Sequence, residues 1–191
     1  MDTNLVHIDN FISDYASFRN YCDGLDYEGI ENPIDGIFYP GVTLNIPAPI
    51  KEEVKHKIEE TVGRSITVNF MFMRLSTKGT KAPHQAHTDS TMGEKSLMLY
   101  LNREKDCAGG TSFVEHWTGM DTDPATEKEL NIWLSDHSKP DKWAIRGMFK
   151  MKENAGCIFN ASMMHRAEPI GGFGDSPEDG RLVLTAFFND C

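Results

Sequence analysis

Hydrophobic positions along the chain follow two different periods. In KEEVKHKIEETV, residues 51–62, Val54, Ile58 and Val62 recur every four positions, which predicts one stripe of an amphipathic helix. From Ser65 onward the apolar residues instead form short runs bounded by turn residues, which is typical of strands. Because the second pattern covers most of the chain, we expect a mainly β protein with flanking helices.

The N-terminal part predicts a few local elements. Residues 5–12 (LVHIDNFI) indicate an edge strand. A helix should follow from about Asp14 to Cys22, with Ser13 as its N-cap. Residues 29–48 carry Gly and Pro between alternating apolar positions, so we expect loops and short strands there.

The remaining strands are separated by turn signals rather than by regularly alternating helices, which favours an antiparallel sandwich or barrel. Their expected sequences are ITVNFMFMRLS, KSLMLYLN, TSFVEH after the Gly109-Gly110 turn, GCIFNASMMH and RLVLTAFFND.

One helical segment interrupts this β pattern. Residues 124–136 begin with Pro124 and carry acidic residues in the first turns, as helix starts often do. We therefore expect a helical insertion at about residues 117–148, at one edge of a single domain that spans residues 1–191. The three tryptophans of the chain should pack this insertion down: Trp117, Trp133 and Trp143.

Charge and composition narrow the classes of partner and compartment. The chain has 19 Lys and Arg against 29 Asp and Glu, a net charge of −10, and no basic cluster. Binding to nucleic acid needs clustered cations, and anionic membranes repel a negative protein, so neither partner is expected. No signal peptide or membrane span is evident, which favours a cytoplasmic protein. Four scattered cysteines suggest reduced thiols rather than a disulfide framework: Cys22, Cys107, Cys157 and Cys191.

The segment PHQAHTDS carries the first candidate chemistry. In an extended segment the side chains at i and i+2 point to the same face, so His87 and Asp89 should lie side by side. An imidazole and a carboxylate that face an interior provide two ligands of a metal site. His84 is a weaker alternative, because three positions before His87 it should face the opposite side.

A third ligand must come from elsewhere in the chain. His165 follows the apolar strand GCIFN, so it can point inward at the strand end. Two histidines and one carboxylate on one octahedral face suit non-haem Fe(II). Three coordination positions then stay open, two for a 2-oxo acid such as 2-oxoglutarate and one for dioxygen. His116 and His137, in or beside the insertion, are expected to have surface roles.

The far carboxylate of 2-oxoglutarate needs a cation, and the planar fork of arginine suits that task. Arg181 opens the strand RLVLTAFFND just after a Gly-rich turn. In an antiparallel pair joined by that turn, Arg181 would lie close to His165. Arg166 is the competing candidate.

Four blocks in order resemble the prolyl-4-hydroxylase-like branch of the Fe(II)/2-oxoglutarate dioxygenases, over about residues 66–190. The resemblance implies a double-stranded β-helix (jelly roll, cupin-like). It also implies iron ligands at His87, Asp89 and His165, and Arg181 on the C5 carboxylate. The blocks are HTD (87–89), SLMLYLN with GGTSF (96–102 and 109–113), MMHRAEPI (163–170) and GRLVLTAFF (180–188). By the same resemblance, further contacts to 2-oxoglutarate are expected from Tyr100, Ser96 and Thr185.

The sequence thus predicts an Fe(II)- and 2-oxoglutarate-dependent dioxygenase. Related halogenases lack the carboxylate ligand, so Asp89 favours a hydroxylase, acting on a small-molecule or peptidyl substrate. Two alternatives stay open: a non-catalytic jelly-roll metal-binding module, and a cupin-type metalloenzyme that does not use 2-oxoglutarate. The resemblance gives no counterpart for the insertion, which could form a lid or the contact of a homodimer.

Overall fold

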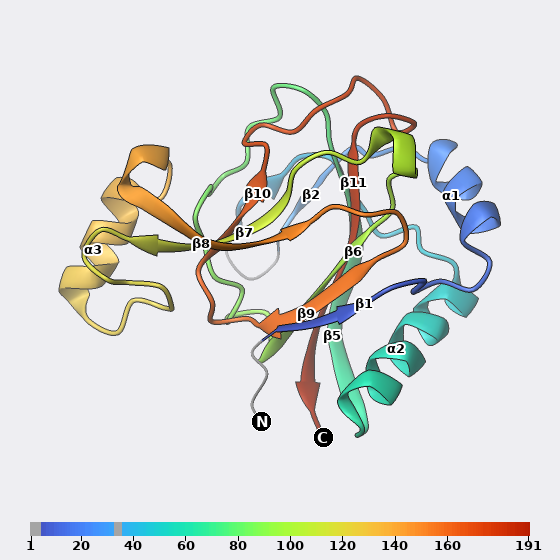
Figure 1. Ribbon diagram of the computed structural model, residues 1–191, viewed down its shortest axis with the longest axis horizontal. Helices are drawn as coiled ribbons and strands as arrows, with labels where there is room; N and C mark the ends of the chain where they lie inside the picture. Colours follow the sequence, from blue (N-terminus) through green and yellow to red (C-terminus); the bar gives the residue numbers. More distant parts are fainter. Residues whose placement is uncertain (1–4, 33–35) are drawn as a thin grey trace.

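The computed structural model describes residues 5–32 and 36–191, and the expectation for residues 29–48 lies partly outside that range. Two antiparallel sheets face each other, with two helices on the outer side of the larger sheet (Figure 1). This is a mainly β double-stranded β-helix, which confirms the predicted fold class. None of the helices in the described part of the chain is long and apolar enough to cross a bilayer.

The larger sheet has six strands in the order β1, β9, β6, β11, β5 and β4, and the smaller has the order β10, β7 and β8. The larger sheet comprises β1 (Leu5–Ile8), β9 (Gly156–Asn160), β6 (Lys95–Tyr100), β11 (Arg181–Asp190), β5 (Ile66–Ser76) and β4 (Val42–Thr43). The smaller comprises β10 (His165–Glu168), β7 (Gly110–His116) and β8 (Trp143–Lys150), and β2 (Ile30–Glu31) pairs with β3 (Phe38–Tyr39). The helices are α1 (Tyr15–Asp23), α2 (Ala48–Val62), α3 (Glu127–Asp136) and two short 3-10 turns (Glu104–Asp106 and Pro140–Lys142).

The two faces of the larger sheet serve different purposes. On β11, Leu182 and Leu184 belong to the core beneath the helices, together with Val54 and Ile58 of α2. The alternate residue Val183 belongs to a second core between the two sheets. Since successive side chains of a strand alternate between faces, the odd-numbered residues of β11 point into the sandwich. Arg181 and Thr185 therefore face the same interior as Val183.

Both helices beside the larger sheet begin at other residues than the sequence predicts. Helix α1 is capped by Asp14, whose carboxylate accepts a hydrogen bond from the Ser17 amide, whereas the Ser13 amide binds Glu53. Helix α2 starts at Ala48, three positions before the predicted start. The prolines near its beginning are tolerated there, because amide groups in the first turn of a helix have no acceptor within the helix. It ends at Gly63, whose φ of +73° suits glycine.

The insertion is shorter than predicted. Residues 143–150 form β8, which pairs with β7 along its length, so only residues 117–142 leave the two-sheet framework. Pairing with β7 explains this difference, because it buries Trp143 and Phe149 although the residues between them are exposed or half-buried. Helix α3 begins after Thr126, whose hydroxyl binds the amide of Glu129 in a capping box, rather than at Pro124.

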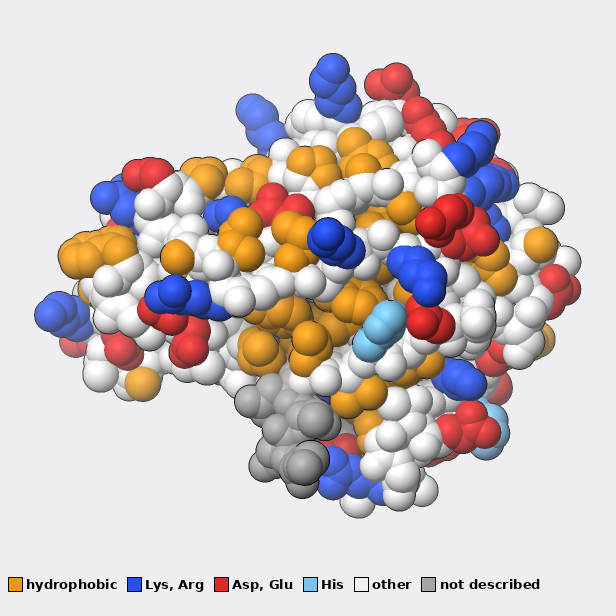
Figure 2. All heavy atoms as spheres, viewed as in Figure 1, with side chains coloured by type: hydrophobic (Ala, Val, Ile, Leu, Met, Phe, Trp, Pro, Cys, Tyr) orange, Lys and Arg blue, Asp and Glu red, His pale blue; other side chains and the backbone are white. Residues whose placement is uncertain are grey.

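The tryptophans of this region do not all pack inward as expected. Trp143 and Trp133 join a small third core, but Trp117 is 72% exposed. On the outer face of β8, Ile145 and Met148 are also exposed. Figure 2 shows hydrophobic side chains gathered in the middle of this face, around β8 and β9.

Strands β10 and β11 are not the antiparallel pair that the sequence predicts. Strand β10 pairs with β7 in the smaller sheet, whereas β11 lies between β5 and β6 in the larger sheet. The Gly-rich segment 171–180 therefore crosses from one sheet to the other. This agrees with the strand order, in which β8, β9, β10 and β11 alternate between the two sheets. His165 and Arg181 approach each other from opposite sheets and not along one hairpin.

Candidate metal centre

Three side chains from distant parts of the chain converge between the sheets. His87, Asp89 and His165 each offer one ligand atom, and these atoms all lie within 4.8 Å of one another. Nε2 of His165 is 3.3 Å from Oδ2 of Asp89, and Nε2 of His87 is 3.7 Å from Oδ1. This spacing lets one cation contact all three groups.

Backbone pairing accounts for the convergence. The amide of His87 donates to the carbonyl of His165 at 3.0 Å, and the amide of His165 donates back at 2.9 Å. This reciprocal pair sets the two imidazoles side by side, with ring centres 4.5 Å apart. Asp89 is fixed by its own amide, which donates to the carbonyl of Ala161 at 2.7 Å.

Further hydrogen bonds orient the three groups. Nδ1 of His87 lies 3.0 Å from the Gln85 carbonyl, and Nδ1 of His165 lies 2.9 Å from the Met163 carbonyl. A carbonyl only accepts, so both rings donate from Nδ1 and leave the Nε2 lone pair directed at the cluster. The Ser96 hydroxyl donates to Oδ2 of Asp89 at 3.2 Å. In this structure Ser96 therefore contacts a candidate metal ligand and helps to orient it.

The electrostatics of His87 and Asp89 favour the protonation states that suit metal ligands. Burial, with a further contribution from His165, lowers the pKa of His87 to about 4. Burial raises the pKa of Asp89, but the two histidines and Ser96 outweigh it and hold that pKa below its usual value. Burial lowers the pKa of His165, and the contact with Asp89 more than reverses this, so the net direction is upward. Asp89 is thus a carboxylate and His87 a neutral imidazole.

Arg181 lies in the same interior with unused hydrogen-bonding capacity. The residue is 3% exposed, and its Nη2 donates to the Gly110 carbonyl at 3.3 Å. Its Nε has no hydrogen-bond partner among the described residues. Burial lowers the pKa of Arg181, against the opposing influence of Tyr100 and Glu168. A buried guanidinium with an unpaired donor is unfavourable, and an anion bound beside it would supply the missing acceptor.

Of the other expected co-substrate contacts, Tyr100 lies beside Arg181. The Tyr100 ring centre is 5.9 Å from the guanidinium carbon, and its hydroxyl is 2.8 Å from Oγ1 of Thr111. Thr185 faces the same interior and lies 3.6 Å from Sδ of Met98. Arg166, the competing cation, pairs with Glu168 at 2.7 Å. It lies on the opposite face of β10 from His165, because neighbouring residues of a strand alternate.

The remaining histidines contribute no atom to this cluster of described residues. The ring of His84 packs against Trp133 and His137, with centres 5.2 and 5.0 Å away. His116 is fully buried between Thr118 and Asp136, which corrects the expectation of a surface role. Its strand, β7, continues beneath the insertion and is covered by it.

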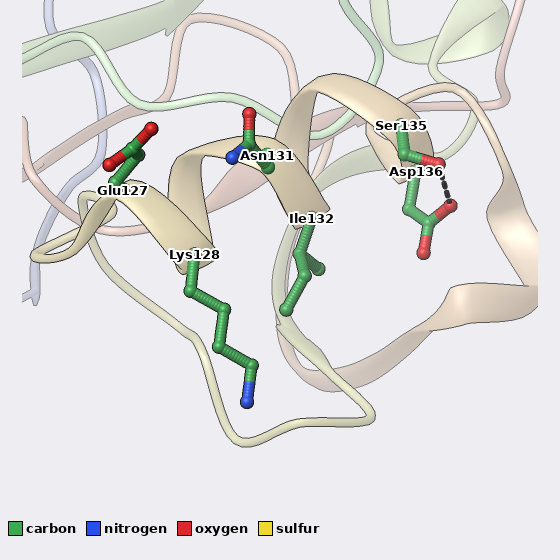
Figure 3. Close-up of a pocket in the computed structure, with 6 residues that line it drawn as sticks. All are labelled: Glu127, Lys128, Asn131, Ile132, Ser135 and Asp136. Carbon is green, nitrogen blue, oxygen red and sulfur yellow. Dashed lines mark hydrogen bonds between the residues drawn. The ribbon is translucent and has the colours of Figure 1, made fainter.

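A cavity of about 410 Å³ opens beside His87 and Asp89. Its walls are largely apolar and include the aromatic residues Phe70, Phe72 and Trp133, which suits an organic ligand. The titratable residues of the lining are Arg74, His87, Asp89, His84 and Asp123. The hollow along α3 in Figure 3 is lined by Glu127, Lys128, Asn131, Ile132, Ser135 and Asp136, none of which belongs to the triad.

Arg74 is the site residue that the sequence analysis missed. It lies on β5, where it pairs with Val183 of β11, and it faces the interior. The available signal was the alternation of Phe70, Phe72 and Arg74, which sets a lone cation on an otherwise apolar strand face. Only the sheet order shows that this face borders the triad.

Comparison with known families gives a match over residues 1–142 to a family of unknown function, DUF6445. The chain belongs to the DUF6445 family. Comparison with curated proteins finds no match.

Several solved structures share the fold of this DUF6445 protein. AviO1 from Streptomyces viridochromogenes Tue57 has 12% identity and a TM-score of 0.58 over 98% of this chain and 90% of that one. The non-heme alpha ketoglutarate dependent epimerase SnoN from nogalamycin biosynthesis has 13% identity and a TM-score of 0.56 over 98% and 76%. HygX from Streptomyces hygroscopicus, solved with iron bound, has 12% identity and a TM-score of 0.54 over 97% and 82%. At these identities the similarity shows a shared fold.

Proposed function

We propose that this DUF6445 protein is a non-haem Fe(II)- and 2-oxoglutarate-dependent oxygenase. In this proposal His87, Asp89 and His165 bind Fe(II), and Arg181 binds the C5 carboxylate of 2-oxoglutarate. The observation that carries it is the convergence of three ligand atoms within 4.8 Å. Support comes from structures of the same fold: SnoN was solved with Fe3+ and alpha ketoglutarate, and HygX with nickel, 2-oxoglutarate and hygromycin B.

The residues of the chain fit both groups. Two imidazoles and a carboxylate are the ligand set that non-haem Fe(II) enzymes use, and they leave part of the metal's coordination sphere open. The cavity beside His87 and Asp89 would let an organic ligand approach a metal bound there. At the other end, the buried Nε of Arg181 is an unused donor where a carboxylate would be held. Iron with its oxo acid would supply the oxidising power that side chains lack.

The protein's own residues would position the metal ligands and shield the site from water. Ser96 fixes Asp89, and the Gln85 and Met163 carbonyls fix the two imidazoles. Tyr100 lies beside Arg181 and would border the oxo acid, and Thr185 faces the same interior. The apolar residues of the cavity walls would keep water from the reacting atoms.

For the reaction, we favour hydroxylation, as in the prolyl-4-hydroxylase-like enzymes that the chain resembles. The intact carboxylate of Asp89 supports this choice. A cavity of about 410 Å³ is in the range of small-molecule sites, so a small-molecule substrate is preferred to a peptidyl one.

An anaerobic titration with Fe(II) and then 2-oxoglutarate tests the proposal. We expect a weak visible charge-transfer band in the wild type and none in His87→Ala or Asp89→Ala. Folded wild-type protein that binds Fe(II) without the band would contradict the role of 2-oxoglutarate.

Two further measurements separate the alternatives. Release of succinate from 2-oxoglutarate, dependent on Fe(II), would exclude a non-catalytic metal-binding module. In a cupin-type enzyme that does not use 2-oxoglutarate, Arg181→Ala would leave metal-dependent turnover unchanged. Under our proposal that variant loses most of its turnover.

A further inference from the structure

A second buried arginine borders the triad. Arg74 of β5 pairs with Val183 of β11, and Arg181 of β11 pairs with Ser76 of β5. These are successive residue pairs on the same face of the sheet, so the two arginines are neighbours on that face. Nε of Arg74 has no hydrogen-bond partner among the described residues, and the side chain lines the cavity. Two guanidinium groups thus face one interior on neighbouring strands, each with an unused donor.

Only one of the two arginines borders the open cavity. Arg74 lines it together with His87 and Asp89, whereas Arg181 does not belong to that lining. Burial lowers the pKa of Arg74 to about 10, helped by the charge of Arg181, while Tyr39 and Asp89 act against it. Arg74 is therefore the guanidinium that shares the cavity with two of the candidate metal ligands.

Two like charges in a buried site are unfavourable unless an anion neutralises them. A dicarboxylate bound between them would remove that repulsion. Arg181, deeper in the fold, suits the carboxylate farthest from the metal. Arg74 borders the open cavity beside the triad, so it suits a carboxylate next to the metal, and a guanidinium matches that group through two parallel hydrogen bonds.

We propose that Arg74 binds the C1 carboxylate of the 2-oxo acid beside the metal triad. This inference rests on the proposed function and adds a second anchor to it. The 2-oxo acid would then be held at both ends, by Arg181 at C5 and by Arg74 at C1. Holding both ends would fix the direction in which the oxo acid lies.

Comparing the binding of two oxo acids distinguishes the role of Arg74 from that of Arg181. 2-Oxoglutarate has both carboxylates, whereas pyruvate has the C1 carboxylate and the keto group but no distal carboxylate. Binding of each is measured anaerobically on Fe(II)-loaded protein, by calorimetry and by the charge-transfer band. The proteins are the wild type, Arg74→Gln, Arg181→Gln and Arg146→Gln. The last is a matched control, because Arg146 lies outside the pocket and pairs with Glu115 at the surface.

Arg74→Gln is expected to weaken both oxo acids by a similar factor of about 10 to 100, since a charge-assisted hydrogen bond of that strength is lost. Arg181→Gln should weaken 2-oxoglutarate by a comparable factor and leave pyruvate unchanged. Arg146→Gln should change neither. Arg74→Lys keeps the charge but not the fork, so it should recover only part of the affinity.

Unchanged affinity of Arg74→Gln for both oxo acids would overturn the inference and assign Arg74 to another ligand. Weaker binding of 2-oxoglutarate alone would also overturn it, because Arg74 would then serve the C5 carboxylate. Failure of the proposed function looks different: the wild type would bind Fe(II) but neither oxo acid. Fe(II) affinity and thermal stability of unliganded Arg74→Gln should match or exceed the wild type, because the variant removes a buried charge and no metal ligand.

Discussion

Nε2 of His165 lies 3.3 Å from Oδ2 of Asp89, although one residue begins β10 and the other precedes β6 on the opposite sheet. The contact joins the two sheets through the groups that would bind the metal. A metal ion bound there would therefore tie the sheets together and stabilise the fold.

This relationship predicts a metal-dependent gain in stability. With Fe(II) or Mn(II) at 100 times its dissociation constant, the free energy of unfolding of the wild type should rise by about 2.7 kcal/mol. Asp89→Ala should show no such rise, because two imidazoles alone hold the ion poorly. Denaturant unfolding with and without metal measures both. Asp175→Ala changes an exposed carboxylate and should keep the full gain, and an equal gain in Asp89→Ala would refute the assignment.

Helix α3 supports the segment that leads into His87 and Asp89. The indole of Trp133 donates to the Ala86 carbonyl at 2.9 Å, and the Ala86 amide donates to the His137 carbonyl at 2.9 Å. Trp133→Phe keeps an aromatic ring but removes the donor, so it should cost about 1 kcal/mol of stability and weaken metal binding several-fold. Calorimetric titration with Mn(II) is the measurement. Trp117→Phe is the matched control, since Trp117 is 72% exposed, and equal effects of the two variants would count against this role.

The Tyr100 hydroxyl connects β6 to β7 and β8. It is 2.8 Å from Oγ1 of Thr111 and 3.1 Å from the Phe149 carbonyl. The side chains of Tyr100 and Thr111 are both buried. Tyr100→Phe should lower the free energy of unfolding by about 1 to 2 kcal/mol. Thr111→Val should have a similar effect, and the double variant should lose less than the sum. Additive losses in urea unfolding would show that the two hydroxyls act independently.

Asp23 gives the fold a dependence on pH. Burial raises the pKa of Asp23, but hydrogen bonds and charge from Arg103 and Arg19 outweigh it and hold the pKa below its usual value. A carboxyl with a lowered folded-state pKa contributes stability above its unfolded pKa of about 3.9, and loses it as the pH falls through the folded pKa. Asp23→Asn should therefore destabilise the protein by about 2 kcal/mol at pH 7, less than for a fully buried pair because Asp23 is partly exposed.

The difference between Asp23→Asn and wild type should shrink as the pH is lowered from 5 to 3. Urea unfolding at several pH values measures it. Glu115→Gln breaks an exposed ion pair with Arg146 and should have little effect at any pH. A difference that stays constant down to pH 3 would rule out the ionised carboxylate as its cause.

Local rules predicted the features that depend on neighbours in the chain. The i, i+2 rule put His87 and Asp89 on one face, and the period of four found α2. The strand runs were found because each carries its own hydrophobic pattern. The start of α1 was misplaced because Ser13 and Asp14 are both good capping residues, and the chain geometry chose Asp14.

Features that depend on which strands become neighbours could not be predicted in this way. β10 and β11 follow each other in sequence, yet they lie in different sheets. The end of the insertion was missed because Trp143 to Lys150 becomes a strand only by pairing with β7. Arg74 was missed because a lone arginine on a strand is an ordinary feature until the sheet order places it beside Arg181 and the triad.

The central claim is that one metal ion lies between two imidazoles and one carboxylate. A crystal grown anaerobically with Fe(II) and 2-oxoglutarate, with data collected at the iron absorption edge, tests it most directly. The account predicts a single anomalous peak about 2 Å from Nε2 of His87, Nε2 of His165 and a carboxylate oxygen of Asp89. A folded protein with its iron peak elsewhere, or with none between these three side chains, would contradict it.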